Sequence, residues 1–535
     1  MKQYFLSVIF LYLFLCGASA REIKNVIFMV PDGTSLSTLS LVRWYQSYTD
    51  PGRTLAIAPY ICGMVTNHSS NAPIGDSAPA MGSYMTGYYS RPGYISMYPP
   101  ESENDIVSVD PSRSYSPNMT VMEAARIARN KAVGLVFTCE FLHATPAATS
   151  AHWYKRSDYG TIQQQMVHNS IDVLIGGGTG FLTPEHETFL VKKGYEVYRN
   201  DIDKFRNSAS KKLWALFGDS AMDNDWDRDT TKQPSLAEMT KKAITLLSKN
   251  REGFFLMVEG SKVDWSSHNN DPVGIISELS AFDAAVKAAI EFAKADGETL
   301  VVICPDHGTG GVSIGNRLSD GNYSGLTLRD MMEPFKKCKK TAEYVTGRLI
   351  NLSKERKDSI SIIMKDLWDI SLDETEIEMI AKAKESAVWS DIRNLILKSL
   401  QSRTHIGFTT HGHTGEDLFL AIYHPQNRQL TGLVAAHELN RYLCNAVGIE
   451  SLDDLSDKYY RNANILFKEK DFIIKPSAQT LKITPRNNKK TTMVITANTN
   501  QVSVNNQIFE TKTPAVYVDK NDTWYVSEEC LLFIK

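Results

Sequence analysis

The chain has 535 residues, of which 42% are hydrophobic and 22% are charged. A chain of this length and composition can bury a large core, and we expect it to form two or more domains. The formal net charge is -3 at pH 7, without the basic excess that is typical of proteins that bind nucleic acids or anionic membranes. We therefore expect no nucleic-acid-binding domain, and any positively charged site must be local.

The N-terminal segment predicts export. Lys2 is followed by the largely apolar residues 4–15 and then by the small residues 17–20, an order that is typical of a cleaved signal peptide. A buried helix or a membrane anchor is the alternative, but the apolar run is short for a membrane span. Cys16 leaves open whether the N-terminus carries a lipid. We predict that residues 1–20 are a signal peptide, that no transmembrane helix remains after its removal, and that the protein is periplasmic or secreted.

Six cysteines follow the predicted signal peptide. Their wide and irregular spacing matches neither a zinc-binding motif nor a dense disulfide framework. One disulfide bridge is possible among them, and the sequence leaves its pairing open: Cys62, Cys139, Cys304, Cys338, Cys444 and Cys530.

The first predicted strand ends at an acidic residue. Residues 25–30 have the pattern of a strand that is buried on both faces, and Asp32 and Gly33 come directly after its end. In open α/β sheets ligands bind at the carboxyl ends of the strands, so Asp32 is a candidate site residue. Gly33 allows another part of the chain to approach the backbone closely. Residues 34–45 predict a helix.

A second candidate lies at the start of a predicted helix. Asp76 or Ser77 could cap a helix that has Pro79 in an early turn, and the free N–H groups at such a helix start attract anions. A plain N-cap is the alternative to a nucleophilic role for Ser77, and this stretch alone does not decide between them.

The following segment has the alternation of a βαβ unit. Residues 119–130 predict a helix and residues 133–138 a buried strand. His143 and Thr145 follow this strand, and Arg156 comes soon after them. The planar guanidinium of an arginine suits bidentate contact with phosphate, although an isolated arginine is usually solvated or paired with an acid. The alternation continues along the chain, with strands expected at 172–178, 299–304 and 418–423 and helices at 183–192, 236–249 and 273–295.

The most informative stretch is residues 254–268. Five apolar residues predict a buried strand that stops at Glu259, again at the end where ligands bind. Asp264 and His268 follow with i, i+4 spacing, which on a helical turn puts a carboxylate and an imidazole on one face. These are metal ligands, although a solvated helix start with a surface histidine is the alternative reading of this pair.

Two later segments add candidate ligands. Asp306 and His307 follow the strand expected at 299–304 and offer one oxygen and one nitrogen ligand to a single ion. His413 lies just before the strand expected at 418–423. Residues 316–405 are more charged and mostly helical in pattern, and we expect an insertion there that covers the top of the sheet.

The tail has a different pattern. From residue 471 to residue 535, short β-rich runs at 481–484, 493–496 and 515–518 are separated by polar residues. They predict a small antiparallel β domain. It could pack on the rest of the chain, attach to a cell-surface partner or serve export.

Taken together, these motifs resemble those of the alkaline phosphatase family over roughly residues 24–450. The resemblance implies a metal-dependent phosphomonoesterase. Together with the predicted signal peptide and the tail, which the resemblance does not cover, it predicts an exported, bacterial-type member with an extra C-terminal domain. It implies an α/β fold, a three-layer sandwich with a central, mostly parallel sheet, and a catalytic domain at residues 21–470. The motifs in chain order are Val30-Pro31-Asp32-Gly33, Asp76-Ser77-Ala78, His143-Ala144-Thr145-Pro146, Val258-Glu259-Gly260 with Asp264 and His268, Asp306-His307, and His413-Thr414-Gly415.

The same resemblance implies roles for these residues. Ser77 is expected to be the nucleophile that becomes a phosphoserine, and Arg156 is expected to hold two phosphate oxygens. Asp76, His143 and Trp265 are expected beside the ligands or on the substrate side. The expected ligand sets are Asp264, His268 and His413 for one Zn2+, Asp32, Asp306 and His307 completed by Ser77 for a second Zn2+, and Asp32, Thr145 and Glu259 for one Mg2+.

Two residues depart from the pattern of the well-studied bacterial members, which resemble one another in having Asp and Lys at the positions of His143 and Trp265. We expect weaker retention of magnesium and activation by added magnesium. The substrates expected from the family are phosphate monoesters, and a homodimer is expected on the same ground.

Three alternatives stay open. A sulfatase of the same superfamily would need Arg where Met81 stands, so its modification signal is missing. A phosphodiesterase relative would typically lack the magnesium ligands, of which Thr145 and Glu259 are both present. The third alternative is a non-catalytic binding protein on the same fold, which the complete set of expected ligands disfavours.

Overall fold

The computed structural model describes residues 22–352, 357–386, 388–468, 470–487 and 490–534. The expected signal peptide at residues 1–20 lies outside the described residues. Among the described helices, none is both long and apolar enough to cross a membrane. The six cysteines within the described ranges are all free, so the disulfide bridge that the sequence allowed is not formed.

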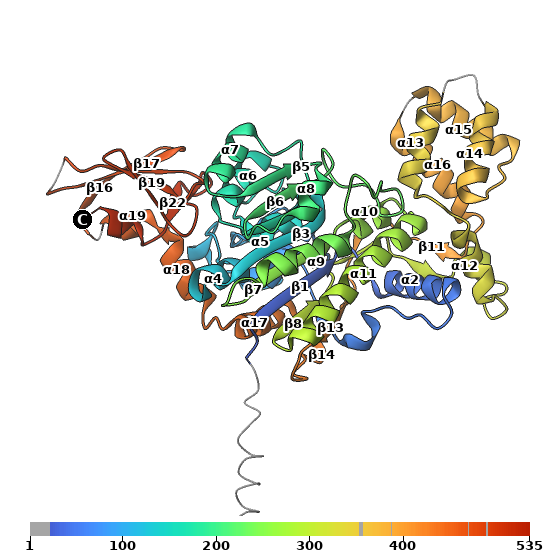
Figure 1. Ribbon diagram of the computed structural model, residues 1–535, viewed down its shortest axis with the longest axis horizontal. Helices are drawn as coiled ribbons and strands as arrows, with labels where there is room; N and C mark the ends of the chain where they lie inside the picture. Colours follow the sequence, from blue (N-terminus) through green and yellow to red (C-terminus); the bar gives the residue numbers. More distant parts are fainter. Residues whose placement is uncertain (1–21, 353–356, 387, 469, 488–489, 535) are drawn as a thin grey trace, which may run out of the picture.

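A ten-stranded sheet forms the middle of the molecule (Figure 1). All its strands run parallel except β13, which runs against both of its neighbours. From one edge to the other the strands are β14 (Gly432–Ala435), β2 (Ile61–Thr66), β13 (Leu418–Tyr423), β8 (Thr299–Ile303), β1 (Asn25–Pro31), β7 (Phe254–Gly260), β3 (Ala132–Glu140), β4 (Val173–Gly177), β6 (Leu213–Leu216) and β5 (Glu196–Arg199).

Helices cover both faces of the sheet. Alternate residues of β1 belong to different buried clusters, Ile27 and Met29 to one and Val26 and Phe28 to the other, because successive side chains of a strand point to opposite faces. Residues 26–30 are all apolar because neither face meets water. The first face carries α2 (Leu36–Thr49), α9 (Leu236–Leu247) and α11 (Pro272–Asp296), and the second carries α3 (Ser77–Thr86), α4 (Val121–Arg129), α5 (Ala144–Ser150), α6 (Tyr159–His168) and α17 (Ala436–Val447).

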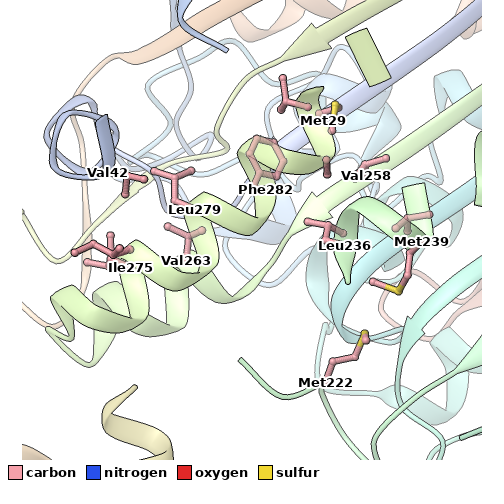
Figure 2. Packing of buried hydrophobic residues seen from close by; sticks show 14 of the residues in the cluster. Met29, Val42, Met222, Leu236, Met239, Val258, Val263, Ile275, Leu279 and Phe282 are labelled. Atoms are coloured by element: carbon pink, nitrogen blue, oxygen red, sulfur yellow. The ribbon is translucent and has the colours of Figure 1, made fainter. Parts of the chain in front are cut away.

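Figure 2 shows part of the packing on the first face. Ile275, Leu279 and Phe282 of α11 lie in the same buried cluster as Met29 of β1 and Val258 of β7. The arrangement confirms the predicted three-layer α/β sandwich. The predicted helices and strands are found with their ends moved by a few residues at most; α11, for example, was expected at 273–295. The remaining helices of the body are α7 (Pro184–Lys192), α8 (Ile202–Asn207), α10 (Lys262–His268) and α18 (Leu452–Tyr459).

The carboxyl ends of the central strands lie side by side. Glu259 of β7 pairs with Val30 of β1, two residues before Asp32. Strand β8, on the other side of β1, ends at Ile303, shortly before Asp306. The acidic residues predicted at strand ends therefore meet at one edge of the sheet, the edge where ligands bind in open α/β folds.

The insertion is helical, as expected. Its helices α13 to α16 form a lobe that projects from the body, and α12 packs beside α2 (Figure 1). The lobe meets the body just after α10, where the Ala342 N–H donates to Asp271 Oδ2 at 3.0 Å and Gln401 Nε2 donates to the Asn270 carbonyl at 2.9 Å. That the insertion covers the top of the sheet stays a prediction. The helices are α12 (Leu328–Lys336), α13 (Ala342–Ile350), α14 (Lys357–Trp368), α15 (Glu374–Ser386) and α16 (Trp389–Gln401).

The tail forms a distinct unit at the end of the molecule that lies opposite the helical lobe (Figure 1). Its two antiparallel sheets contain the predicted strands. The unit begins before residue 471, because helix α19 (Ala463–Lys468) shares a buried cluster with the larger sheet. One sheet has β16 (Phe472–Pro476), β17 (Thr480–Pro485), β18 (Met493–Thr496), β19 (Gln501–Val504) and β20 (Gln507–Glu510); the other has β15 (Arg461–Asn462), β22 (Thr523–Val526) and β21 (Val516–Val518), and the helices are α19 (Ala463–Lys468) and α20 (Cys530–Phe533).

Candidate metal centre

Three side chains converge between helix α10 and the short strand β12 (His413–Thr414). Asp264 and His268 are one helical turn apart, and Asp264 Oδ2 lies 3.4 Å from His268 Nε2. His413 reaches the same point from β12, because its Nε2 lies 3.8 Å from Asp264 Oδ1 and 3.1 Å from His268 Nε2. The pair that shares one helical face is thus joined by a histidine 145 positions further along the chain.

Backbone hydrogen bonds fix which nitrogen of each histidine faces this group. His413 Nδ1 donates to the Gly75 carbonyl at 2.8 Å, and His268 Nδ1 donates to the carbonyl of His411. In each neutral ring Nε2 then carries a lone pair, so two lone pairs face each other across 3.1 Å. This arrangement is repulsive unless a cation lies between the two nitrogens.

A second group of three side chains surrounds the hydroxyl of Ser77. Asp32 follows strand β1, and Asp306 and His307 follow strand β8. His307 Nε2 lies 3.5 Å from Asp32 Oδ1, 3.3 Å from Asp306 Oδ2 and 3.1 Å from Ser77 Oγ. Ser77 is the first residue of α3 and is only 2% exposed, so its hydroxyl is held in place at a buried helix start.

Gly33 allows the first two groups to lie close together. Its φ is +67°, and a Cβ at this position would lie 2.6 Å from Asp264 Oδ1. Its N–H donates to Asp306 Oδ1 at 3.1 Å. The close approach that the sequence predicted at this glycine therefore occurs, and it brings α10 against the end of β1.

A third group lies around Glu259 at the end of β7. Glu259 Oε1 and the Thr145 hydroxyl have no hydrogen-bond partner among the described residues. Cys139 donates its thiol hydrogen to Glu259 Oε2 at 3.4 Å, and ligand atoms of Cys139, His143 and Glu259 lie within 4.8 Å of one another. Cys139 was not among the expected site residues, because a cysteine inside a buried strand is usually a core residue.

Buried negative charge accumulates where these groups meet. Burial and the carboxylates of Asp306, Asp264 and Glu259 raise the pKa of Asp32 well above its usual value. Burial also raises the pKa of Asp306, and it raises the pKa of Glu259 to about 8. Carboxylates buried together favour protonation unless positive charge compensates them, and bound divalent cations would supply that charge.

Arg156 lies next to the start of α3. Its Nη1 donates to Asp76 Oδ1 at 2.7 Å. Asp76 stands at the N-cap position of α3, but its carboxylate makes no capping bond; it accepts from the Gly93 N–H at 2.9 Å and from Arg156. Although burial opposes it, the Arg156 guanidinium lowers the pKa of Asp76, so this carboxylate stays ionised and orients the arginine.

His143 and Trp265 lie beside the third group. The His143 ring lies 5.6 Å from the Trp265 ring at 73°, and His143 Nε2 lies 3.3 Å from Arg156 Nη2. Burial and the Arg156 guanidinium lower the pKa of His143 to about 4. The ring is therefore neutral near pH 7, and it brings no negative charge to the third group.

The distances in the first two groups fit bound ions. Zn2+ holds histidine and carboxylate ligands at about 2.0–2.1 Å in a tetrahedron, which puts neighbouring ligand atoms roughly 3.3 Å apart. The shortest and longest ligand-to-ligand distances given above are 3.1 and 3.8 Å. Buried carboxylate oxygens without a hydrogen-bond partner are the atoms that such ions would satisfy, and among the described residues these include Asp32 Oδ1 and Oδ2, Asp306 Oδ2 and Glu259 Oε1.

The amino-acid sequence matches one family of known proteins over most of its length. The family model described as alkaline phosphatase matches residues 23–212 and 185–449. Alkaline phosphatase 3 of Bacillus subtilis (strain 168) is 35% identical over 442 residues, which cover 80% of this chain and 89% of that protein. The repressible alkaline phosphatase of Saccharomyces cerevisiae is 27% identical over 459 residues, which cover 77% of each chain.

Solved structures give the same picture of the fold. The cold-active alkaline phosphatase of Shewanella sp. superposes with a TM-score of 0.69 at 25% identity, covering 79% of this chain and 99% of that chain. The alkaline phosphatase of Thermus thermophilus has a TM-score of 0.69 at 23% identity, covering 81% of this chain and 93% of that chain. The family match stops at residue 449, before the C-terminal unit begins.

Proposed function

The chain belongs to the alkaline phosphatase family and is a phosphoric monoester hydrolase, and we propose that Ser77 is its nucleophile and that two zinc ions and one magnesium ion complete its site. The observation that carries this proposal is the position of the Ser77 hydroxyl, 3.1 Å from a histidine nitrogen that also faces two buried carboxylates. A serine in that place can be activated, whereas a serine that only caps a helix has no such neighbours.

The three groups would each hold one ion. Bound there, the ions would lower the pKa of the serine hydroxyl and of water and would stabilise the negative charge that develops during phosphoryl transfer. The proposed ligand sets are Asp264, His268 and His413 for one Zn2+, Asp32, Asp306 and His307 with Ser77 for the second Zn2+, and Asp32, Thr145 and Glu259 for Mg2+.

In the proposed reaction the chain's own residues bind, attack and orient. Ser77 Oγ attacks phosphorus as it loses its proton, and a phosphoserine forms while the bond from phosphorus to the alcohol oxygen breaks. The alcohol oxygen takes up a proton from water, which balances the proton that the serine hydroxyl gives up to water. A water molecule then cleaves the phosphoserine, which restores the serine hydroxyl and releases phosphate.

Arg156 would hold the phosphate during both steps. Its guanidinium can donate two parallel hydrogen bonds to two phosphate oxygens. Asp76 fixes one side of the guanidinium at 2.7 Å, so the arginine is oriented before the substrate arrives. Such preorganisation reduces the entropy that binding must remove.

The charge of the proposed site favours a phosphate dianion. With three divalent ions and Arg156 against the carboxylates of Asp32, Glu259, Asp264 and Asp306, the site carries a net charge of about plus three. A monoester at neutral pH carries nearly two negative charges and a diester one. We expect kcat/KM for a monoester to exceed that for a diester with the same leaving group by at least about 100-fold.

A colorimetric assay with the two esters, each with and without a chelator, tests the proposed function. Activity on the monoester that disappears with the chelator is the expected result. Equal rates on the two esters would contradict the charge argument and favour the phosphodiesterase alternative, and activity that survives complete removal of metal would contradict the proposed ligand sets.

Magnesium is expected to activate the enzyme after mild chelation. His143 is neutral and packs against Trp265, so neither side chain adds a carboxylate to the third group. We expect His143→Asp to lower the magnesium concentration needed for half activation by roughly 10-fold or more, because outer ligands of this kind change metal affinity by about that factor. The measurement is the rate against added magnesium, together with bound magnesium by elemental analysis. A wild-type rate that does not respond to magnesium would contradict this prediction.

Two further expectations stay proposals. If residues 1–20 are a signal peptide, the protein is periplasmic or secreted. The homodimer implied by the family resemblance is checked by the molar mass of the purified protein in solution.

A further inference from the structure

The C-terminal unit touches the segment that carries Arg156. We call residues 151–158 the arginine loop and residues 519–522, which join β21 to β22, the clasp turn. The Tyr154 hydroxyl donates to Asp519 Oδ1 at 2.6 Å. This bond joins the clasp turn to the arginine loop only two positions before Arg156.

A second contact lies beside the first. Asn521 Nδ2 donates to the Ser114 carbonyl at 3.0 Å. The ring of Tyr115, the next residue, lies 6.2 Å from the Tyr154 ring, and both rings lie within 6.4 Å of the Tyr94 ring. The three rings contact one another in the edge-on and tilted geometries that aromatic pairs prefer.

The contacts continue inward from Tyr94 to the proposed nucleophile. The carbonyl of Gly93 accepts from the Arg156 N–H at 2.8 Å, and the N–H of Gly93 donates to Asp76 Oδ2 at 2.9 Å. Asp76 in turn accepts from Arg156 Nη1 and directly precedes Ser77. One unbroken series of contacts therefore runs from the clasp turn to the phosphate side of the site.

The clasp turn has a fixed place relative to the sheet. Val516, Val518 and Tyr525 of the hairpin β21–β22 are buried in the same cluster as the helices on the second face of the sheet. The hairpin is therefore packed into the body and is not tethered loosely to it. A turn held in this way can restrain the loop that it touches.

We propose that the clasp turn positions Arg156 for phosphate through Tyr154, so that the C-terminal unit is a working part of the phosphate site. The inference rests on the proposed function of Arg156 and adds to it a residue outside the matched family segment. Tyr154 is a positioning residue, because it acts through the arginine loop and touches no reacting atom. Without its bond to Asp519 the loop would sample more positions, and phosphate would be held less tightly while Ser77 stayed in place.

The first test compares three single variants in the full-length, metal-loaded enzyme. Tyr154→Phe and Asp519→Ala each remove the bond, and we expect each to raise the inhibition constant of inorganic phosphate and KM by roughly three- to tenfold, the range for one exposed hydrogen bond. The value of kcat should change much less. Tyr198→Phe is the matched control, because the Tyr198 hydroxyl makes the same kind of bond, 2.8 Å to Glu196 Oε2, on the edge strand β5 and away from both the clasp turn and the arginine loop.

The second test separates positioning from general stability. Arg156→Ala should raise the phosphate inhibition constant by itself, and adding Tyr154→Phe to it should cause no further increase. If Tyr154→Phe behaves like Tyr198→Phe, or if it weakens phosphate binding equally in the Arg156→Ala background, the clasp proposal is wrong. If Arg156→Ala leaves phosphate inhibition unchanged, the proposed role of Arg156 is wrong and the clasp proposal falls with it.

Discussion

Replacing Ser77 with alanine is expected to lower kcat by roughly 10^4- to 10^6-fold, the loss that follows removal of a nucleophile from a hydrolase. The Ser77 hydroxyl is buried at the start of α3 and lies 3.1 Å from His307 Nε2. Without Oγ no phosphoserine can form, and the residual rate must come from direct attack by water on the bound ester. The measurement is kcat for a monoester at saturating substrate, on enzyme whose metal content has been checked.

Ser83→Ala is the control for this substitution. Ser83 lies on the same helix, and its hydroxyl contacts Asn67 Oδ1 and the Ala80 carbonyl. It is linked to the proposed ligand Asp306 through Asn67, whose Nδ2 donates to the Asp306 backbone carbonyl at 3.2 Å. We expect this variant to keep kcat within about an order of magnitude of the wild type. A Ser77→Ala enzyme that keeps more than a tenth of the wild-type kcat would rule out Ser77 as the nucleophile.

Replacing Glu123 with glutamine is expected to lower the free energy of unfolding by about 3 to 5 kcal/mol, the usual cost of breaking a buried charge pair. Glu123 is fully buried on α4 and lies 3.1 Å from His152 Nε2. His152 Nδ1 faces the Ser96 carbonyl at 3.1 Å, so both ring nitrogens lie beside acceptor oxygens. Glu123 also accepts from Asn169 Nδ2 and from the Tyr460 hydroxyl. A glutamine would turn an amide N–H2 toward one or more of these donors.

Urea unfolding curves measure this effect, with Glu238→Gln as the control. Glu238 occupies the same position on α9, three residues after the N-cap, but it pairs with Arg206 near the surface. Exposed pairs of this kind contribute at most about 1 kcal/mol. An equal loss of unfolding free energy in the two variants would contradict the expectation that the buried pair contributes more to stability than the exposed one.

The stability that Glu123 contributes also depends on pH. Although burial opposes it, His152, the Thr120 backbone and the Tyr460 hydroxyl lower the pKa of Glu123 to about 2 from a usual value of 4.5. A carboxylate with a lowered pKa stabilises the fold fully above its unfolded pKa. The difference between wild type and Glu123→Gln should therefore have its full value just above about pH 4.5 and should shrink as the pH falls toward 2.

The sequence was most informative where a fully apolar run stops at a polar residue. Strands of a mostly parallel sheet are covered on both faces, so their ends are easy to recognise, and Asp32 and Glu259 were found in this way. The i, i+4 pair of Asp264 and His268 needed only local geometry. The local pattern does not predict which of these residues contact one another. Their contacts join positions 145 to 273 residues apart and depend on the order of the strands, which follows from the packing of the whole sheet.

What the sequence could not predict depends on such long-range contacts. The bond from Asp76 to Gly93 in place of a helix cap, the thiol of Cys139 beside Glu259, and the clasp turn against Tyr154 all involve residues whose local pattern is ordinary. The elements against which the helical insertion packs were also not predicted, because helical periodicity fixes which face of a helix is buried but not the element that buries it.

X-ray diffraction at the zinc absorption edge, on crystals grown without added zinc, tests the central claim most directly. The account predicts two anomalous peaks, one between Asp264, His268 and His413 and one between Asp32, Asp306 and His307 beside Ser77. A map that lacks a peak at one or both of these groups, or that shows zinc only at other places, would contradict the account.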